Sequence, residues 1–158
     1  MGEPRVSVKA LVFRAGRILL TKKSDSEGDF YIAPGGGQEH GETMPQTLER
    51  EVREETGYIV KAGELFFVRE YIGANHEFAE FDGKMHQVEL YFRATLQGMD
   101  TVPVTQPDTG QIGVEWVELG RLERVRLYPQ SLREKFVSVA GENGEPDSRN
   151  HVYVGDVN

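Results

Sequence analysis

Three consecutive glycines followed by a strongly marked helix constrain the local fold of this chain more than any other feature. Residues 35–37 are glycine, and Thr43 with Gln46 three residues later has the pattern of a helix capping box. Helical periodicity continues to about residue 56, and Gly57 stands where a left-handed residue commonly ends a helix. The sequence therefore predicts a helix over 43–56 that is entered through a glycine-rich turn.

That helix would carry three clustered carboxylates, on Glu51, Glu54 and Glu55. At helical spacing they fall within about 100° of one another. Like charges at this spacing repel by roughly 0.2–0.5 kcal/mol per pair, which Arg50 and Arg53 would partly offset. The plain alternative is a solvated acidic face. The functional hypothesis is a site for a hard cation such as Mg²⁺, which the glycine backbone can approach closely.

The spacing across this segment resembles the Nudix box, G-x5-E-x7-R-E-U-x-E-E-x-G-U, in which U is aliphatic. The matching positions are Gly36, Glu42, Arg50, Glu51, Val52, Glu54, Glu55 and Gly57. Tyr58 departs from the aliphatic residue at the last position, but its ring can still pack under the helix end. A motif with this many set positions is far more specific than a short glycine motif, so the chain resembles the MutT-like Nudix hydrolases.

The resemblance implies a role for each matching residue. The implied metal ligands are the backbone carbonyl of Gly36 or its neighbour Gly35 and the carboxylates of Glu42, Glu51, Glu54 and Glu55. The implied catalytic residues are Glu51, Glu54, Glu55 and Arg50, and the arginine would orient a glutamate by a salt bridge. The implied cofactor is Mg²⁺, with Mn²⁺ as a substitute. The implied reaction is hydrolysis of a phosphoanhydride bond by a metal-activated water.

The general base is left open by the sequence. Many Nudix enzymes carry a glutamate shortly before a tryptophan-bearing strand, where this chain has Gln111. The alternative acids are Asp108, Glu115, Glu77 and Glu80, each of which could equally be an ordinary surface acid. Glu77 and Glu80 are favoured because they lie in a long predicted loop over 73–85. The predicted substrate contacts are Gly35, Gly36, Gly37, Glu77 and Glu80.

The rest of the chain alternates strand patterns with one more helix. Strands are predicted over 6–13, 17–22, 30–33, 58–62, 65–72, 88–96, 114–117 and 151–154. A second helix is predicted to begin at Ser131, where Glu134 completes a capping box. Polar loops are predicted over 97–113 and 141–150. We predict a single Nudix domain over 1–158 of the α/β (α+β) class, an α/β/α sandwich with a mixed sheet between helices.

Composition narrows the partners that we expect. The net charge of −8 argues against a protein that binds nucleic acid through a basic face. An acidic enzyme can still bind polyphosphates through divalent cations. The chain has no cysteine, no signal-peptide pattern and no apolar segment long enough to span a membrane. We therefore expect a cytoplasmic enzyme with no nucleic-acid or membrane partner, and dimers are common in the family that it resembles.

The expected substrate is a small nucleotide in which a nucleoside diphosphate is linked to a further group. A proline that often marks the ADP-ribose branch is absent, since Gly73 and Ala74 stand there. Nucleoside triphosphates are favoured because the chain is compact, as in a housecleaning pyrophosphatase, and ADP-ribose or another nucleotide sugar is the alternative. A non-catalytic, nucleotide-sensing Nudix module is the alternative class, against which the complete carboxylate set argues. An isomerase on this fold would need further catalytic residues.

Overall fold

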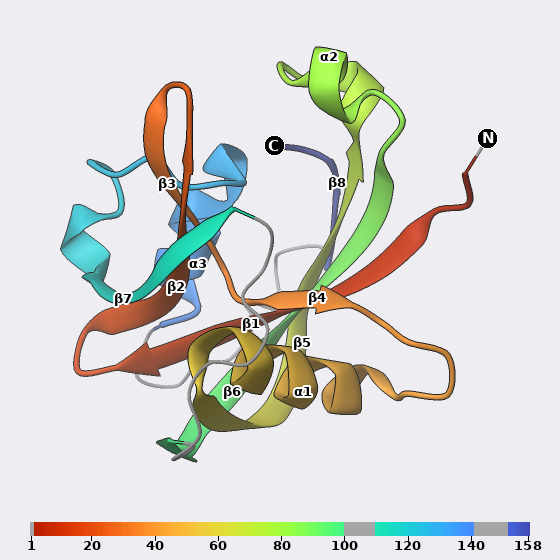
Figure 1. Ribbon diagram of the computed structural model, residues 1–158. Helices are drawn as coiled ribbons and strands as arrows, with labels where there is room; N and C mark the ends of the chain where they lie inside the picture. Colours follow the sequence, from red (N-terminus) through yellow and green to blue (C-terminus); the bar gives the residue numbers. More distant parts are fainter. Residues whose placement is uncertain (1, 100–109, 141–151) are drawn as a thin grey trace.

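A curved, mixed β-sheet forms the centre of the computed structural model, which describes residues 2–99, 110–140 and 152–158 (Figure 1). Across these residues the strand order is β3-β2-β1-β6-β5-β8, while β4 pairs with β1 and β7 pairs with β2. The strands are β1 (Arg5–Arg14), β2 (Arg17–Asp25), β3 (Gly28–Ile32), β4 (Gly35–Gly37), β5 (Tyr58–Ile72), β6 (His86–Met99), β7 (Gln111–Glu118) and β8 (Tyr153–Asp156). The helices are α1 (Met44–Thr56), α2 (Ala79–Asp82) and α3 (Arg133–Ser138), with 3-10 turns at Gly73–Asn75, Leu119–Arg121 and Gln130–Leu132.

Strand β1 organises the sheet because it has neighbours along both edges. It pairs in parallel with β6 on one edge, and antiparallel with β4 and β2 on the other. Successive side chains of a strand point to opposite faces of the sheet. Val8, Ala10 and Val12 therefore join one hydrophobic cluster, whereas Leu11 joins a second. One strand thus contributes to the cores on both faces.

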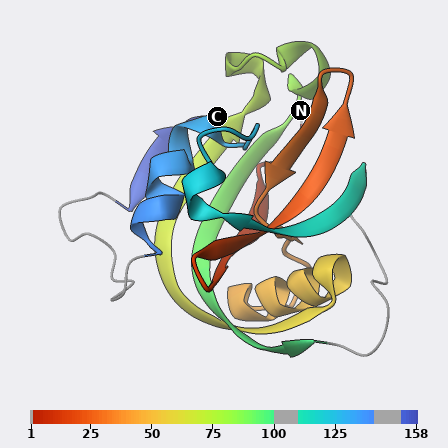
Figure 2. The same ribbon diagram turned by 90° about the vertical axis from the view of Figure 1, so that its left-hand side faces the viewer.

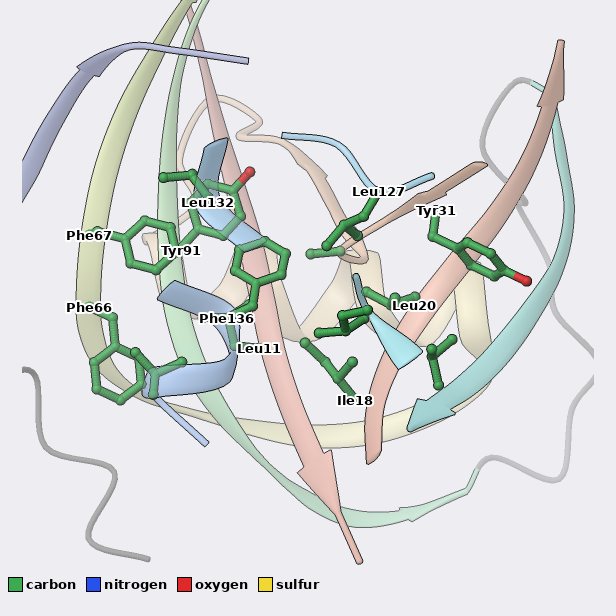
Figure 3. Close-up of a cluster of buried hydrophobic side chains, with 14 residues drawn as sticks. Leu11, Ile18, Leu20, Tyr31, Phe66, Phe67, Tyr91, Leu127, Leu132 and Phe136 are labelled. Carbon is green, nitrogen blue, oxygen red and sulfur yellow. The ribbon is translucent and has the colours of Figure 1, made fainter. Parts of the chain in front are cut away.

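The two cores are covered by different helices, which lie on opposite sides of the sheet in Figure 2. Helix α1 buries Leu48 and Val52 in the first core. Helix α3 buries Phe136 in the second, where its ring centroid lies 6.1 Å from that of Phe67 and 5.7 Å from that of Tyr91 (Figure 3). The predicted α+β sandwich with a mixed sheet between helices is therefore confirmed.

Residues 35–37 form a short strand instead of the predicted turn. Strand β4 pairs with β1 in the register Ser7↔Gly37, Val8↔Gly36 and Lys9↔Gly35. A Cβ atom at Gly35 would lie 2.0 Å from the carbonyl oxygen of Val8, and the φ angle of +147° there also favours glycine. The glycines allow the backbone to pack closely against β1. This contact joins residues far apart in the chain, so local sequence patterns do not predict it.

Other boundaries also differ from the sequence-based predictions. The two strands predicted over 58–62 and 65–72 are one strand, β5, whose register shifts near Ala62 and Leu65, as in a β-bulge. The predicted capping box at Ser131 is wrong, because Ser131 lies inside the turn Gln130–Leu132 that precedes α3. The long loop over 73–85 contains a 3-10 turn and α2.

One predicted strand and two predicted loops border on or include residues that the structure does not describe. Strand β8 begins at Tyr153, two residues later than the strand predicted from residue 151. Strand β6 reaches Met99 and β7 begins at Gln111, so the loop predicted over 97–113 is shorter than expected at both ends. Residues 100–109 and the loop predicted over 141–150 lie outside the described residues. Within the described ranges, no helix combines the length and apolar character needed to cross a membrane.

Candidate active site

The capping signals in the sequence are formed at both ends of α1. The Thr43 hydroxyl accepts a hydrogen bond from the Gln46 amide, and the Gln46 side chain accepts one from the Thr43 amide at 2.8 Å. At the other end, Gly57 has a left-handed φ of 76° and its amide donates to the Arg53 carbonyl at 2.9 Å. With its apolar face packed on the sheet, α1 turns its carboxylates toward β4.

Arg50 gathers three of the predicted carboxylates around one guanidinium group. Its Nε and Nη2 atoms donate to the two carboxylate oxygens of Glu42, at 2.5 and 2.9 Å. Its Nη1 atom donates to Glu51 at 2.9 Å and to Glu54 at 3.2 Å. Nη2 also lies 3.3 Å from the carbonyl oxygen of Gly37. Arg50 therefore forms the predicted ion pairs with glutamates and links them to the glycine strand.

Two carboxylates of α1, those of Glu51 and Glu55, lie directly against β4. A Cβ atom on Gly36 would lie 2.5 Å from the carboxyl carbon of Glu51, so only glycine leaves that carboxylate its place. Glu55 is 5% exposed, and one of its carboxylate oxygens accepts a hydrogen bond from the Gly35 amide at 3.1 Å. The structure thus brings together α1 and the glycines, as the sequence predicted, through a strand instead of a turn.

Glu42 is held in its ionised form by this network. Its hydrogen bonds with Arg50 lower the pKa of the Glu42 carboxyl to about 2, against a smaller opposing effect of burial. The Glu39 amide and the Thr47 hydroxyl also donate to this carboxylate, at 3.1 and 2.8 Å. Pairing with Glu42, and then with Glu51, raises the pKa of Arg50. The cluster therefore holds one permanent positive charge among three carboxyl groups.

The chemistry of this donor set fits a hard divalent cation. The available donors are carboxylate and backbone carbonyl oxygens, which Mg²⁺ prefers as ligands. In the described part of the chain, no three acidic or histidine side chains converge closely enough to form a ready-made metal site. The reason is visible at Arg50, whose guanidinium occupies the space among Glu42, Glu51 and Glu54. Cation binding at this site would require Glu51 or Glu54 to turn away from the Arg50 guanidinium.

The candidates for a general base lie in different places. Gln111 is beside α1, where its side-chain amide donates to the backbone carbonyl of Glu55 at 2.9 Å, but an amide is no proton acceptor at neutral pH. Glu115 accepts a hydrogen bond from the Tyr31 hydroxyl at 2.6 Å. Asp108 lies outside the described residues.

Glu77 and Glu80 are not brought to the α1 carboxylates. They flank or belong to α2, which Figures 1 and 2 show at the opposite end of the molecule from α1. Glu77 accepts a hydrogen bond from the Asn158 side chain at 3.1 Å, and Glu80 is exposed. Glu77 does line a pocket, but the carboxylates on α1 remain the acids nearest the glycine strand.

A pocket of about 810 Å³ adjoins β1, and among the described residues none of the α1 carboxylates and none of the β4 glycines lines it. Aromatic rings lie along it: Tyr128 makes edge contacts with Phe30 and Phe78, at centroid distances of 5.6 and 5.5 Å. Arg5 and Lys9 of β1 also line it. Lys9 is the one charged residue in the strand predicted over 6–13, whereas nothing local in the sequence marks Tyr128.

The fold is an α+β arrangement in which an acidic helix faces a glycine strand, and Arg5, which lines the large pocket, lies against that strand. A family model described as the NUDIX domain matches residues 3–137. The chain therefore belongs to the Nudix hydrolase family. The predicted family is confirmed, and the predicted enzyme class, a Nudix hydrolase, follows from it.

Similar proteins include several with this fold. An ADP-ribose pyrophosphatase of Methanocaldococcus jannaschii is 39% identical over 67 residues, which are 41% of this chain and 39% of that protein. The chain therefore spans about two fifths of that relative. A MutT NUDIX hydrolase from Burkholderia pseudomallei is 26% identical, with a TM-score of 0.65 over 86% of this chain and 99% of its own. A NUDIX hydrolase from Nitrosomonas europaea has a TM-score of 0.70 at 20% identity, over 91% of this chain and 93% of its own, which is a similarity of fold.

Proposed function

We propose that this protein hydrolyses a phosphoanhydride bond in a small nucleotide, a nucleoside diphosphate linked to a further group, with Mg²⁺ as cofactor. The observation that carries the proposal is the contact between Gly36 and the Glu51 carboxylate, with Arg50 holding further carboxylates beside it. A solvated acidic helix face would have no need of a strand without side chains opposite it. A cation site that must also admit a phosphate group does need one.

Each residue of the cluster has its own part in this proposal. Glu51, Glu54 and Glu55, with Glu42 and the Gly36 carbonyl, would hold the cation. When bound, the cation neutralises the diphosphate and lowers the pKa of a bound water. Arg50 holds the Glu51 carboxylate by a hydrogen bond in the absence of the cation, and the Gly35 amide orients Glu55. We assign the base to an α1 carboxylate, because Gln111 is an amide and α2 lies at the other end of the molecule.

The pocket supports a nucleoside as the group that is recognised. Its volume of about 810 Å³ suits a nucleotide-sized ligand, and Phe30, Phe78 and Tyr128 offer ring surfaces for a base. Nucleoside triphosphates are the favoured substrates, in keeping with the similarity to a MutT protein. ADP-ribose is the second candidate, and the 39% identity with an ADP-ribose pyrophosphatase over 67 residues favours it.

The test is a substrate panel of nucleoside triphosphates, ADP-ribose and UDP-sugars with Mg²⁺, read by release of phosphate, pyrophosphate or monophosphate. We expect turnover of at least one class and a loss of about 10³-fold in kcat for Glu55→Gln. Glu49→Gln is the matched control, since Glu49 is on the same helix but accepts from the Ala62 amide, toward β5. Undiminished turnover by Glu55→Gln would overturn the assignment of the site.

Binding of nucleotides without hydrolysis of any compound in the panel would favour the sensing module instead. The same assay with Mn²⁺ in place of Mg²⁺ tests whether Mn²⁺ can replace Mg²⁺ as the cofactor. A homodimer and a cytoplasmic location stay predictions that rest on the resemblance and the composition.

A further inference from the structure

Arg5 lies on the face of β4 opposite the Glu51 carboxylate. A Cβ atom on Gly37 would meet the Arg5 guanidinium nitrogens at 2.3 and 2.5 Å, just as a Cβ on Gly36 would meet the carboxylate of Glu51. Adjacent residues of a strand face opposite ways. The glycine strand is therefore flanked by an acidic group on the side of α1 and by a guanidinium group on the other side.

The side on which Arg5 lies is that of the pocket. Arg5 and Lys9 both line it, and they are four residues apart on β1, so both point to the same face of the sheet. Lys9 is attracted by the buried carboxylate of Glu89 on the neighbouring strand β6. Among the described residues, no ion pair or hydrogen bond engages the Arg5 side chain, which stays largely exposed. Arg5 is thus the cation at this edge of the pocket with its donors available.

We propose that Arg5 binds the substrate phosphate that lies on the pocket side of β4, while the α1 carboxylates and their cation act on the other phosphate. This inference rests on the proposed function. A guanidinium group can donate two parallel hydrogen bonds to a phosphate, and it stays charged at all relevant pH values. A diphosphate crossing the glycine strand would then have a cation on each of its two ends. Arg5 is a substrate-binding and orienting residue in this scheme, and Lys9 adds positive charge behind it.

This arrangement gives a second reason why β4 consists of glycines. Gly36 leaves space for a carboxylate and Gly37 leaves space for a guanidinium. Replacement of Gly37 by alanine would displace Arg5 without removing its charge. Gly37→Ala and Arg5→Gln therefore test the same contact in two independent ways.

The experiment measures binding of the α,β-methylene analogue of ADP, and of adenosine, in EDTA and in Mg²⁺, by calorimetry. We expect Arg5→Gln to raise the Kd of the analogue about tenfold or more in both buffers and to leave the Kd of adenosine unchanged. Arg5→Lys should fall between the two, because it keeps the charge but loses the planar fork. Gly37→Ala should change binding in the same direction as Arg5→Gln.

Arg17→Gln is the matched control, because Arg17 is also an exposed strand-end arginine but pairs with Glu118 on the surface. A Kd within twofold of the unmodified protein for Arg5→Gln, with its melting temperature unchanged, overturns the inference. Weaker binding of adenosine by the same factor also overturns it, since the effect would not concern phosphate. If the unmodified protein hydrolyses nothing but Arg5→Gln still weakens the analogue alone, the proposed function fails and the phosphate contact stands.

Discussion

Replacement of Gly36 by alanine should remove activity while leaving the fold intact. The added Cβ would lie 2.5 Å from the carboxyl carbon of Glu51 and 2.6 and 2.7 Å from its oxygens, so the carboxylate must move. That carboxylate ends a flexible side chain, and its displacement is structurally inexpensive. Its pairing with Arg50 is partly exposed and is worth roughly 0–1 kcal/mol. Alanine in place of glycine regains about 0.4–1 kcal/mol from the unfolded state.

The two effects on stability nearly cancel, so the free energy of unfolding should change by less than about 1 kcal/mol. For a chain of this size that is a shift of at most about 2–4 °C in Tm. Activity should respond far more strongly, because the carboxylate would leave the position from which it could hold a cation. We expect kcat/KM to fall at least about 100-fold, which corresponds to about 2.7 kcal/mol. The assays are thermal unfolding and initial rates over a Mg²⁺ titration.

Two further glycines provide the comparison. Gly35→Ala places its Cβ 2.0 Å from a backbone carbonyl at a φ of +147°, so it should cost about 2–6 kcal/mol in stability and lower Tm by at least about 4 °C. Gly98→Ala meets no atom within 4 Å and should change neither property. Unchanged kcat/KM for Gly36→Ala would refute the reasoning, as would a loss of activity that merely follows unfolding.

Two other predictions concern stability. The pKa of Glu42 is depressed to about 2 in the folded state, so ionised Glu42 stabilises the fold above its unfolded pKa of about 4.3, and this contribution is lost as the pH falls toward 2. The difference in Tm between the unmodified protein and Glu42→Gln should therefore shrink between about pH 5 and pH 2. A difference in Tm that stays constant over this range would contradict the prediction. Phe136→Ala should cost about 3–5 kcal/mol in chemical denaturation, because the ring is fully buried against Phe67 and Tyr91, and a cost below about 1 kcal/mol would show that α3 does not support this core.

Helix α1 shows which structural features local sequence patterns can predict. Its capping box and its left-handed Gly57 depend on residues within one or two turns of each other, and the structure forms both as predicted. The prediction failed at Ser131, where the same capping pattern is present but the chain winds into a 3-10 turn and buries Leu132. A capping signal therefore predicts a helix start only where packing does not impose another local geometry.

The site is determined at two levels. The family, the helix and its carboxylates were predictable because they follow from fixed spacings along one segment. Three features depend on tertiary contacts: the glycines form a strand, Gln111 donates to the carbonyl of Glu55, and Arg5 lies against Gly37. These contacts join residues far apart in the chain, and they depend on the register in which β1 pairs with its neighbours. Since a shift of one residue reverses the face of every side chain in a strand, no local pattern could have predicted which groups meet across β4.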